Sequence, residues 1–382
     1  MHLNYHLPSY FTKKVREEIG ELYASSVISN LAQSITALFE PIFLYNVLHF
    51  TVPQVLLFFA VVYITYLPTI ILGGKFASAY GYKHSIAMSV PFQVLYWVLL
   101  LLGRESPGLA YTAAIALGLQ KALFWPGFHA LMARYADQQQ LGREFSVVYA
   151  IEMISQIIGP FIGGFLAQRF SMTATFVIAA IVYSFSVMPL FTKQELFVPK
   201  NYHYGDTWNL FKAIPKKFVG YMGFGEELIM LTIWPVFIYI VVKNYEGTGI
   251  LATMASLIAA VMAVIIGKIT DQYTKRVLIK LGAFFSALVW FARFIASNVW
   301  NVFALDTLSR ASKEMDFIPL STVTYLRAAA NHVVPYAIFF EQSLSVGKLS
   351  ACLLGALLFH ITGSFVVLFV LAGCYSLLYM YI

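Results

Sequence analysis

The chain contains 382 residues, of which 60% are hydrophobic and 11% are charged, and its mean hydropathy is +0.75. A soluble chain of this length would fold into two or three domains, and 25 basic and 18 acidic side chains are too few to cover their surfaces. The composition therefore excludes a soluble globular protein and predicts an integral membrane protein. The formal net charge of +7 is spread over short loops between apolar runs, which argues against a nucleic-acid partner.

Apolar runs long enough to cross a bilayer recur along the whole chain. A transmembrane helix needs about 20 largely apolar residues. Twelve segments meet this requirement: 20–46, 53–77, 85–102, 109–134, 145–167, 173–191, 218–242, 249–269, 277–296, 300–326, 335–359 and 362–381. They predict an all-α membrane protein with twelve transmembrane helices. No short apolar run with a cleavage site precedes the first segment, so we expect no cleaved signal peptide.

One long polar stretch, from Thr192 to Lys217, divides these segments into two groups of six. We therefore predict an N-terminal six-helix bundle over 1–192, a cytoplasmic linker over 193–217 and a C-terminal six-helix bundle over 218–382.

Charged loop residues set the predicted orientation of the helices. Most Lys and Arg residues fall on one side of the twelve-span topology, and Arg104, Arg169 and Lys243 fall on the other. By the positive-inside rule, both termini and the linker then lie in the cytoplasm. We expect the protein to be integral to the cell (inner) membrane.

The two groups of segments share an internal repeat. Three short matches recur at a spacing of 193 or 194 residues: Pro41–Tyr45 with Pro235–Tyr239, Gly74-Lys75 with Gly267-Lys268, and Phe124-x-Pro126 with Phe317-x-Pro319. A nearly constant spacing across separate segments indicates duplication of a six-helix unit. We therefore expect two pseudo-symmetric halves, with a functional site where they meet.

The turn after the second segment carries a charged loop motif. It reads GKFASAYGYKH, and its counterpart after the eighth segment reads GKITDQYTKR. Both resemble the G-x-x-x-D-x-x-G-R-[KR] loop of the major facilitator superfamily. The matching positions are Gly74, Ser78 (in place of the usual Asp), Gly81 and Lys83 in the first copy, and Gly267, Asp271, Lys275 and Arg276 in the second. The resemblance implies a gating latch in which Asp271 biases the conformational equilibrium, and an ordinary charged turn is the alternative.

The fifth segment carries a second motif of this superfamily. It is similar to the G-P-x-x-G-G signature of the twelve-span drug/proton antiporters, and its residues are Gly159, Pro160, Gly163 and Gly164. Gly and Pro together permit a bend and a close approach of helices. The resemblance implies the two-bundle fold of the superfamily and transport by alternating access, without choosing a substrate.

Ionisable side chains inside the apolar segments are candidates for a functional site, because such groups are costly in hydrocarbon unless they face a partner or water. The candidates for the substrate and proton site are Glu40, Lys121, His129, Glu152, Gln156, Glu226, Glu227, Arg310, Glu314, Glu341 and Lys348, with Tyr45, Trp125, Trp234 and Tyr239 as candidate stacking partners. Structural alternatives remain open. The charges of the tenth segment can form a self-paired network, His129 can bond a carbonyl freed by Pro126, and the aromatic residues can serve packing alone.

Among the carboxylates, Glu40 is the first candidate for proton coupling. A carboxylate in a low-dielectric interior avoids its desolvation penalty by protonation or by pairing with a base such as Lys121 or Lys348. Alternation between the two would link proton occupancy to substrate occupancy. Glu40 is preferred because it adjoins Pro41, which removes a helical hydrogen bond beside it. The other candidates are Glu152, Glu227 and Glu341.

The leading hypothesis is a secondary active transporter that moves a small solute by alternating access, coupled to protons. A facilitative uniporter of the same fold and a non-transporting membrane receptor or enzyme are the alternatives. The sequence contains no G-x-x-x-x-G-K-[ST] loop for ATP and no clustered Asp, His or Cys motif typical of a membrane enzyme. We expect no catalytic residues, no cofactor and no metal site. The expected partners are a small-molecule substrate, protons and membrane lipid, and we expect a monomer.

The orientation can be tested by labelling at Asn201 in the linker. With Asn201→Cys as the single cysteine, a membrane-impermeant maleimide should react only from the cytoplasmic side, because the linker is predicted to lie there. Right-side-out and inside-out vesicles separate the two sides. Reaction from outside only would contradict the positive-inside assignment.

Overall fold

The computed structural model describes residues 13–135, 141–192, 195, 199–270, 274–330 and 333–382. Within these ranges every regular element is helical, as predicted. The spans of the N-terminal half are α1 (Lys13–Ala37) with α2 (Phe39–Ile42) and a π-helical turn (Phe43–Val47), α3 (Val52–Tyr80), α4 (Tyr82–Leu102), α5 (Pro107–Tyr135), α6 (Leu141–Arg169), and α7 (Met172–Ser184) with a 3-10 turn (Phe185–Phe191).

The C-terminal half follows a linker that carries α8 (Tyr204–Ala213). Helix α8 is not among the predicted segments, because a helix of 10 residues is too short for a span. The spans of this half are α9 (Pro215–Met222) with α10 (Gly225–Val242), α11 (Tyr245–Thr270), α12 (Lys275–Ala292) with a 3-10 turn (Arg293–Ile295), α13 (Val299–Ala330), α14 (Val333–Thr362), and α15 (Phe365–Leu378) with a 3-10 turn (Tyr379–Tyr381).

Each of the twelve predicted segments corresponds to a helix of the structure. By length and hydropathy, 9 helical segments of the described chain are able to cross a membrane, and the segment that contains α15 is a shorter apolar helix. The remaining two, α5 and α13, are less apolar because they carry interior polar side chains such as Lys121 and Asp306. The two spans with low hydropathy, α5 and α13, therefore both carry candidate site residues.

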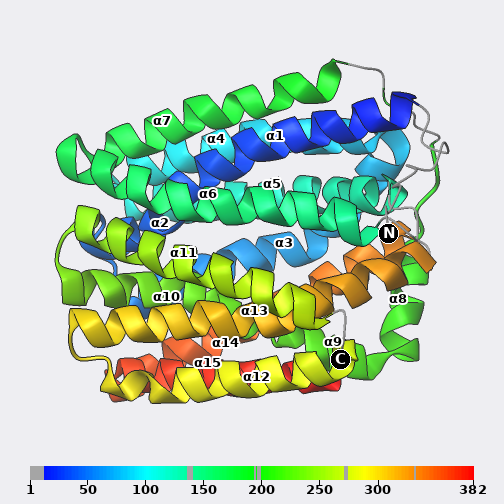
Figure 1. Cartoon of the computed structure of the whole chain (residues 1–382). Coiled ribbons are helices and arrows are strands. Elements are labelled where there is room, and N and C mark those ends of the chain that lie inside the picture. Colours follow the sequence, from blue (N-terminus) through cyan, green and yellow to red (C-terminus); the bar gives the residue numbers. More distant parts are fainter. Residues whose placement is uncertain (1–12, 136–140, 193–194, 196–198, 271–273, 331–332) are drawn as a thin grey trace, which may run out of the picture.

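The two halves form two bundles that lie side by side (Figure 1). Helices α1, α4, α6 and α7 fill the upper part of the view, and α10, α12, α13 and α15 fill the lower part. Helices α8 and α9 and the C-terminus lie at one end of the bundles, which we call the linker end; the opposite end is the far end. Contacts between the halves run from α3, α5 and α6 to α11, α13 and α14.

The internal repeat is reflected in a pair of equivalent tryptophans. Trp97 on α4 and Trp290 on α12 are 193 residues apart, and each is at most 1% exposed. Trp97 donates its indole N–H to Glu40 at 2.8 Å, and Trp290 donates to Glu226 at 2.9 Å. Each acceptor lies on the first span of its own half. The shared contact supports the prediction of two pseudo-symmetric bundles.

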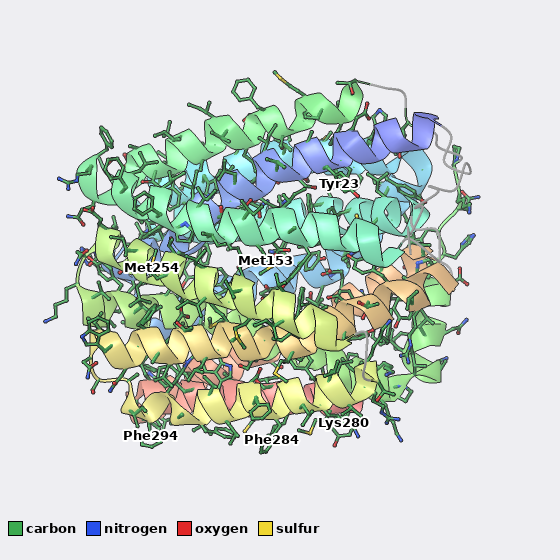
Figure 2. All side chains as sticks on the ribbon, in the orientation of Figure 1. Tyr23, Met153, Met254, Lys280, Phe284 and Phe294 are labelled. Atoms are coloured by element: carbon green, nitrogen blue, oxygen red, sulfur yellow. The ribbon has the colours of Figure 1, made fainter. Side chains whose placement is uncertain are left out.

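Large apolar side chains cover the outside of the bundles. Figure 2 shows Phe284 and Phe294 pointing away from the helices, and their exposed fractions are 47% and 69%. Met254 on α11 is also exposed. So many large apolar side chains facing outward would be unfavourable in water. This surface is the one that contact with lipid requires.

The glycines of the fifth-span motif bring α6 into close contact with two helices. A Cβ atom at Gly163 would lie 2.1 Å from the backbone oxygen of Ile35 on α1, and one at Gly164 would lie 2.7 Å from the backbone oxygen of Tyr245 on α11. Gly159 approaches α1 in the same way. The motif therefore packs α6 within its own half and against the other half.

Gly163→Ala should destabilise the protein by about 1–3 kcal/mol, the usual cost of overpacking, because the new methyl group would overlap a backbone oxygen. Thermal unfolding of the purified protein in detergent should show a lower midpoint. Gly205→Ala in α8 is the matched control, because nothing lies within 4 Å of its Cβ position. Equal midpoints for the two variants would contradict this packing role.

Candidate functional site

The two halves are joined near the linker end by a buried chain of hydrogen bonds. Nε2 of His129 on α5 lies 2.8 Å from Oε1 of Glu341 on α14, and Nδ1 lies 2.8 Å from the hydroxyl of Tyr325 on α13. Tyr66 on α3 donates its hydroxyl proton to Oε2 of Glu341 at 2.8 Å. His129, Glu341 and Tyr66 are 7%, 4% and 1% exposed. Two helices from each half therefore meet at one imidazole and one carboxylate.

Aromatic rings enclose His129. Trp125 stacks on the imidazole with ring centroids 5.3 Å apart, and Phe340 meets it edge-on at 5.9 Å. Trp125 is a candidate stacking partner for a substrate by sequence, and in this conformation it stacks on a histidine. The rings fix the orientation of the imidazole and keep water from its faces.

Tyr66 and Tyr325 are missing from the predicted site. Each is one tyrosine among many aromatic residues in an apolar segment, and no spacing in the sequence marks it. Their role depends on the packing of α3 against α14 and of α5 against α13.

A second group of charges lies around Lys348 on α14. Its Nζ lies 3.1 Å from Oε2 of Glu227 on α10. Lys121 on α5 is half-buried and lies within electrostatic range of Lys348, Glu227 and Glu341. It makes no hydrogen bond or ion pair with any residue that the structure describes. A lysine of one half thus interacts electrostatically with an ion pair of the other half.

Helices α6 and α13 carry a third polar group. Gln156 donates to Glu152 at 3.1 Å, and Glu152 has no basic partner in the described part of the chain. Tyr149 on α6 donates to Glu314 on α13. This bond is a second link between the halves. The acceptors in this polar group, Glu152 and Glu314, are both acids.

Glu40 is hydrogen-bonded within its own half. It accepts from Thr36 at 3.0 Å, from Tyr96 at 2.9 Å and from Trp97 at 2.8 Å. The helix is interrupted beside Pro41, where α1 and α2 are separate and a π-helical turn follows. All three donors are neutral and belong to the N-terminal half. The contacts therefore do not connect Glu40 to the interface between the halves.

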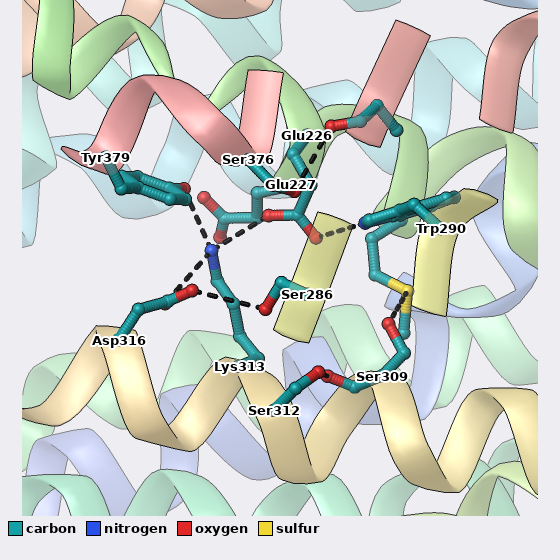
Figure 3. Close-up of polar contacts among 12 residues, drawn as sticks. Glu226, Glu227, Ser286, Trp290, Ser309, Ser312, Lys313, Asp316, Ser376 and Tyr379 are labelled. Atoms are coloured by element: carbon teal, nitrogen blue, oxygen red, sulfur yellow. Dashed lines mark hydrogen bonds and ion pairs between the residues drawn. The ribbon is translucent and has the colours of Figure 1, made fainter. Parts of the chain in front are cut away.

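The charges of α13 form a network inside the C-terminal half (Figure 3). Nζ of Lys313 lies 2.8 Å from Oε2 of Glu226, 2.8 Å from the hydroxyl of Tyr379 and 3.7 Å from Oδ1 of Asp316. Trp290 donates to the other oxygen of Glu226. Glu226 and Asp316 are 2% and 0% exposed. These contacts match the self-paired network that is the structural alternative for the charges of the tenth segment.

Arg310 belongs to a neighbouring pair on the same helix. Its Nε lies 3.0 Å from Oδ2 of Asp306, and Trp234 donates to Oδ1 of Asp306 at 2.9 Å. The guanidinium of Arg293 lies 3.8 Å from the centroid of the Trp234 ring. Arg310 and Trp234 are thus held by partners within their own half.

The other two candidate stacking residues also have partners in the protein. Tyr239 stacks on Tyr245 with ring centroids 5.0 Å apart, and Tyr45 is half-buried against the hydrophobic core. Tyr245 in turn accepts a hydrogen bond from Asn46 at 2.7 Å, which joins the two halves near the far end.

The loop motifs lie at the linker end. In the first copy, Lys83 forms a buried ion pair with Glu21, and Ser78 is 3% exposed. In the second copy, Gly267 lies on α11, and Lys275 and Arg276 begin α12. Asp271 lies outside the described residues. Its role as a latch stays a prediction.

Lys313→Met should lower the stability of the C-terminal half, because it leaves Glu226 and Asp316 buried without a base. Breaking one side of a buried ion pair costs about 3–5 kcal/mol. Thermal unfolding followed by tryptophan fluorescence would measure the loss. Lys280→Met is the control, because Lys280 lies on the outer face of α12 (Figure 2). A midpoint equal to that of the control would show that the network contributes nothing to stability.

Comparison with known proteins identifies the family. The sequence model of the Major Facilitator Superfamily matches residues 22–305. The solved structure of the D-xylose-proton symporter superimposes with a TM-score of 0.71 over 94% of this chain and 95% of that chain, at 12% sequence identity. That likeness confirms the twelve-span fold.

A partial match exists to the Na(+), Li(+), K(+)/H(+) antiporter of Planococcus maritimus. The two sequences are 26% identical over 132 residues, which are 33% of this chain and 31% of the antiporter. The match thus spans about a third of the length of that relative. Because the family model covers most of the chain and the fold agrees with it, the protein belongs to the Major Facilitator Superfamily of membrane transporters.

Proposed function

We propose that the protein is a proton-coupled secondary transporter in which His129 and Glu341 form the coupling site. The observation that carries this proposal is the 2.8 Å contact between the two side chains across the interface of the halves. Both groups are able to bind or release a proton, and both are almost fully buried.

Proton occupancy at this pair is linked to the position of the halves. The bond exists when α5 and α14 are together at the linker end. Separation of the halves breaks the bond and brings each group into contact with water. Because the protonation state changes the free energy of closing, closing must change the proton affinity by the same amount.

The structure favours Glu341 over Glu40 for this role. Glu40 accepts three hydrogen bonds from neutral donors of its own half, and these contacts need not change when the halves move. Glu341 accepts one bond from each of two helices of the opposite half. An acid that loses partners in each cycle is better suited to exchange its proton.

The solute is proposed to bind between Lys121 and the Glu227–Lys348 pair. Lys121 has no partner in the described part of the chain and lies close to an ion pair of the other half. A polar solute that contacts Lys121 and either member of that pair would be held by both halves at once. Such a position is what alternating access requires of a substrate.

A second candidate function is exchange of a cation for protons. Three acids of the described spans make no ion pair with a base: Glu40, Glu152 and Glu314. An uncompensated carboxylate in a low-dielectric interior takes up a proton or a cation. The partial match to a Na(+), Li(+), K(+)/H(+) antiporter also favours this candidate.

Glu341→Gln should abolish proton-driven transport, with at least a tenfold loss of rate, while gradient-free exchange of solute persists. The measurement uses proteoliposomes with a pH-sensitive dye inside, an imposed pH gradient, and challenge with Na+, K+ and a panel of sugars, amino acids, nucleosides and drugs. His129→Gln should behave in the same way, because it removes the other member of the pair.

Glu105→Gln is the matched control, because Glu105 is an exposed glutamate of the far-end loop. A proton signal on addition of Na+ or K+ would select the cation exchanger. If Glu341→Gln retained full proton-driven transport, the coupling site would be elsewhere, and Glu40, Glu152 and Glu227 would be tested next. Full proton-driven transport in all four variants would rule out coupling through these carboxylates, whereas solute transport that does not respond to the pH gradient would make a uniporter the better assignment.

A further inference from the structure

The linker between the halves supplies a carboxylate to the loop that lacks one. Oε1 of Glu195 accepts the backbone N–H of Tyr82 at 2.8 Å, and Oε2 accepts that of Lys83 at 3.2 Å. These are the first two residues of α4, where backbone N–H groups have no partner within the helix. The side chain of Glu195 is 3% exposed. Glu195 therefore caps α4 from outside the helix.

Gly81 makes room for this contact. Its φ is +116°, a conformation that side chains disfavour, and a Cβ atom there would lie 2.6 Å from Oε2 of Glu195. The loop motif has Ser78 where the superfamily usually has Asp. The acid that the loop lacks at position 78 is thus provided by a residue more than one hundred positions later in the chain.

Two further linker residues, Lys200 and Tyr202, contact the end of α3. The backbone N–H of Lys200 donates to the carbonyl oxygen of Ser78 at 2.9 Å. The ring of Tyr202 lies 3.5 Å from the Cβ position of Gly74. These contacts of Glu195, Lys200 and Tyr202 are with the N-terminal half.

The next residues bond to the C-terminal half. The hydroxyl of Tyr204 donates to the side-chain oxygen of Gln342 on α14 at 3.2 Å. Thr207 donates to the carbonyl oxygen of Pro335 on α14 at 3.2 Å and exchanges a hydrogen bond with Tyr202 at 2.7 Å. Gln342 also donates to the carbonyl oxygen of Leu67 on α3 at 3.1 Å. The linker thus crosses from α3 to α14 beside a direct bond between them.

We propose that Glu195 and residues 199–207 form a strap that holds the halves together at the linker end. The strap is anchored on the N-terminal half by Glu195 and Lys200, and on the C-terminal half by Tyr204 and Thr207. The chain from residue 200 to residue 204 spans at most about 14 Å when fully extended. Separation of α3 from α14 at this end must therefore break anchors on one side.

The strap sets the balance between closed and open conformations. Its anchors on both halves are satisfied together only in the closed conformation, so weakening any one of them lowers the population of that conformation. This role is independent of proton binding at His129 and Glu341. If the strap proposal were disproved, the proposed coupling site would still stand. If the coupling site were disproved, the strap proposal would still stand.

The experiment measures the distance between the halves at the linker end. Spin labels are attached at Ala79→Cys on α3 and Lys280→Cys on α12, two exposed positions, after replacement of Cys352 and Cys374 by Ser. Pulsed electron paramagnetic resonance in nanodiscs then gives the populations of short and long distances. Tyr204→Phe removes one anchor on the C-terminal half, and Glu195→Ala removes the cap on α4. Glu105→Ala is the matched control.

Each strap variant should raise the ratio of long to short distances about fivefold over the control, the effect expected for loss of one capping or hydrogen-bonding contact. Size-exclusion elution and the unfolding midpoint confirm that each variant is folded. If Glu195→Ala does not fold, Tyr204→Phe decides, because it leaves α4 capped. A folded Tyr204→Phe variant with the distance distribution of the control would overturn the proposal.

Discussion

The constraint on which the rest of the structure depends is the lack of hydrogen-bonding partners in the hydrocarbon around the bundles. Backbone groups meet this constraint by forming helices throughout the described spans. Ionisable side chains meet it by pairing. Lys313 with Glu226 and Asp316, Arg310 with Asp306, and Lys348 with Glu227 are all such pairs within the C-terminal half.

The bonds between the halves differ in kind from the bonds within them. The charge pairs named above lie within α13 or join two helices of the same half, and separating either member would leave a buried charge without its partner. Across the interface the contacts are mostly between neutral groups or with a group that can exchange a proton. They include Tyr66 and His129 with Glu341, Gln342 with the backbone of α3, and Asn46 with Tyr245. The ion pair Arg169–Glu246 also crosses the interface, and its side chains are 62% and 35% exposed. Because the strong charge pairs lie within the halves and the weaker contacts lie between them, each half is rigid and the interface between the halves can open.

Much of the fold could be predicted from sequence because it depends on local composition. Twelve runs of apolar residues, a repeat of 193 residues and a glycine motif in the fifth span are properties of the chain that need no knowledge of packing. Two features of the linker could not be predicted from the sequence. Helix α8 is short and lies in a polar linker, and Glu195 is one of two acids in that linker with nothing in its neighbourhood to mark it.

The candidate site was predictable in its members but not in their pairing. The sequence favours Glu40 because Pro41 adjoins it, and the helix is indeed interrupted there, yet the partners of Glu40 are three neutral donors from the same half. Which acid faces the other half depends on how α14 packs against α3 and α5, and that packing joins positions more than two hundred residues apart. Local sequence carries no signal for such a contact.

The stacking of Trp125 on His129 has an optical consequence. An indole ring that lies against an imidazole is quenched when the imidazole gains a proton, because the cation accepts an electron from the excited indole. With ring centroids 5.3 Å apart, Trp125 is close enough to report the charge of His129. The other five tryptophans have different neighbours, so the change in emission with pH can be assigned by replacing Trp125 alone. The protein thus carries a built-in fluorescent reporter beside the group on which transport is proposed to depend.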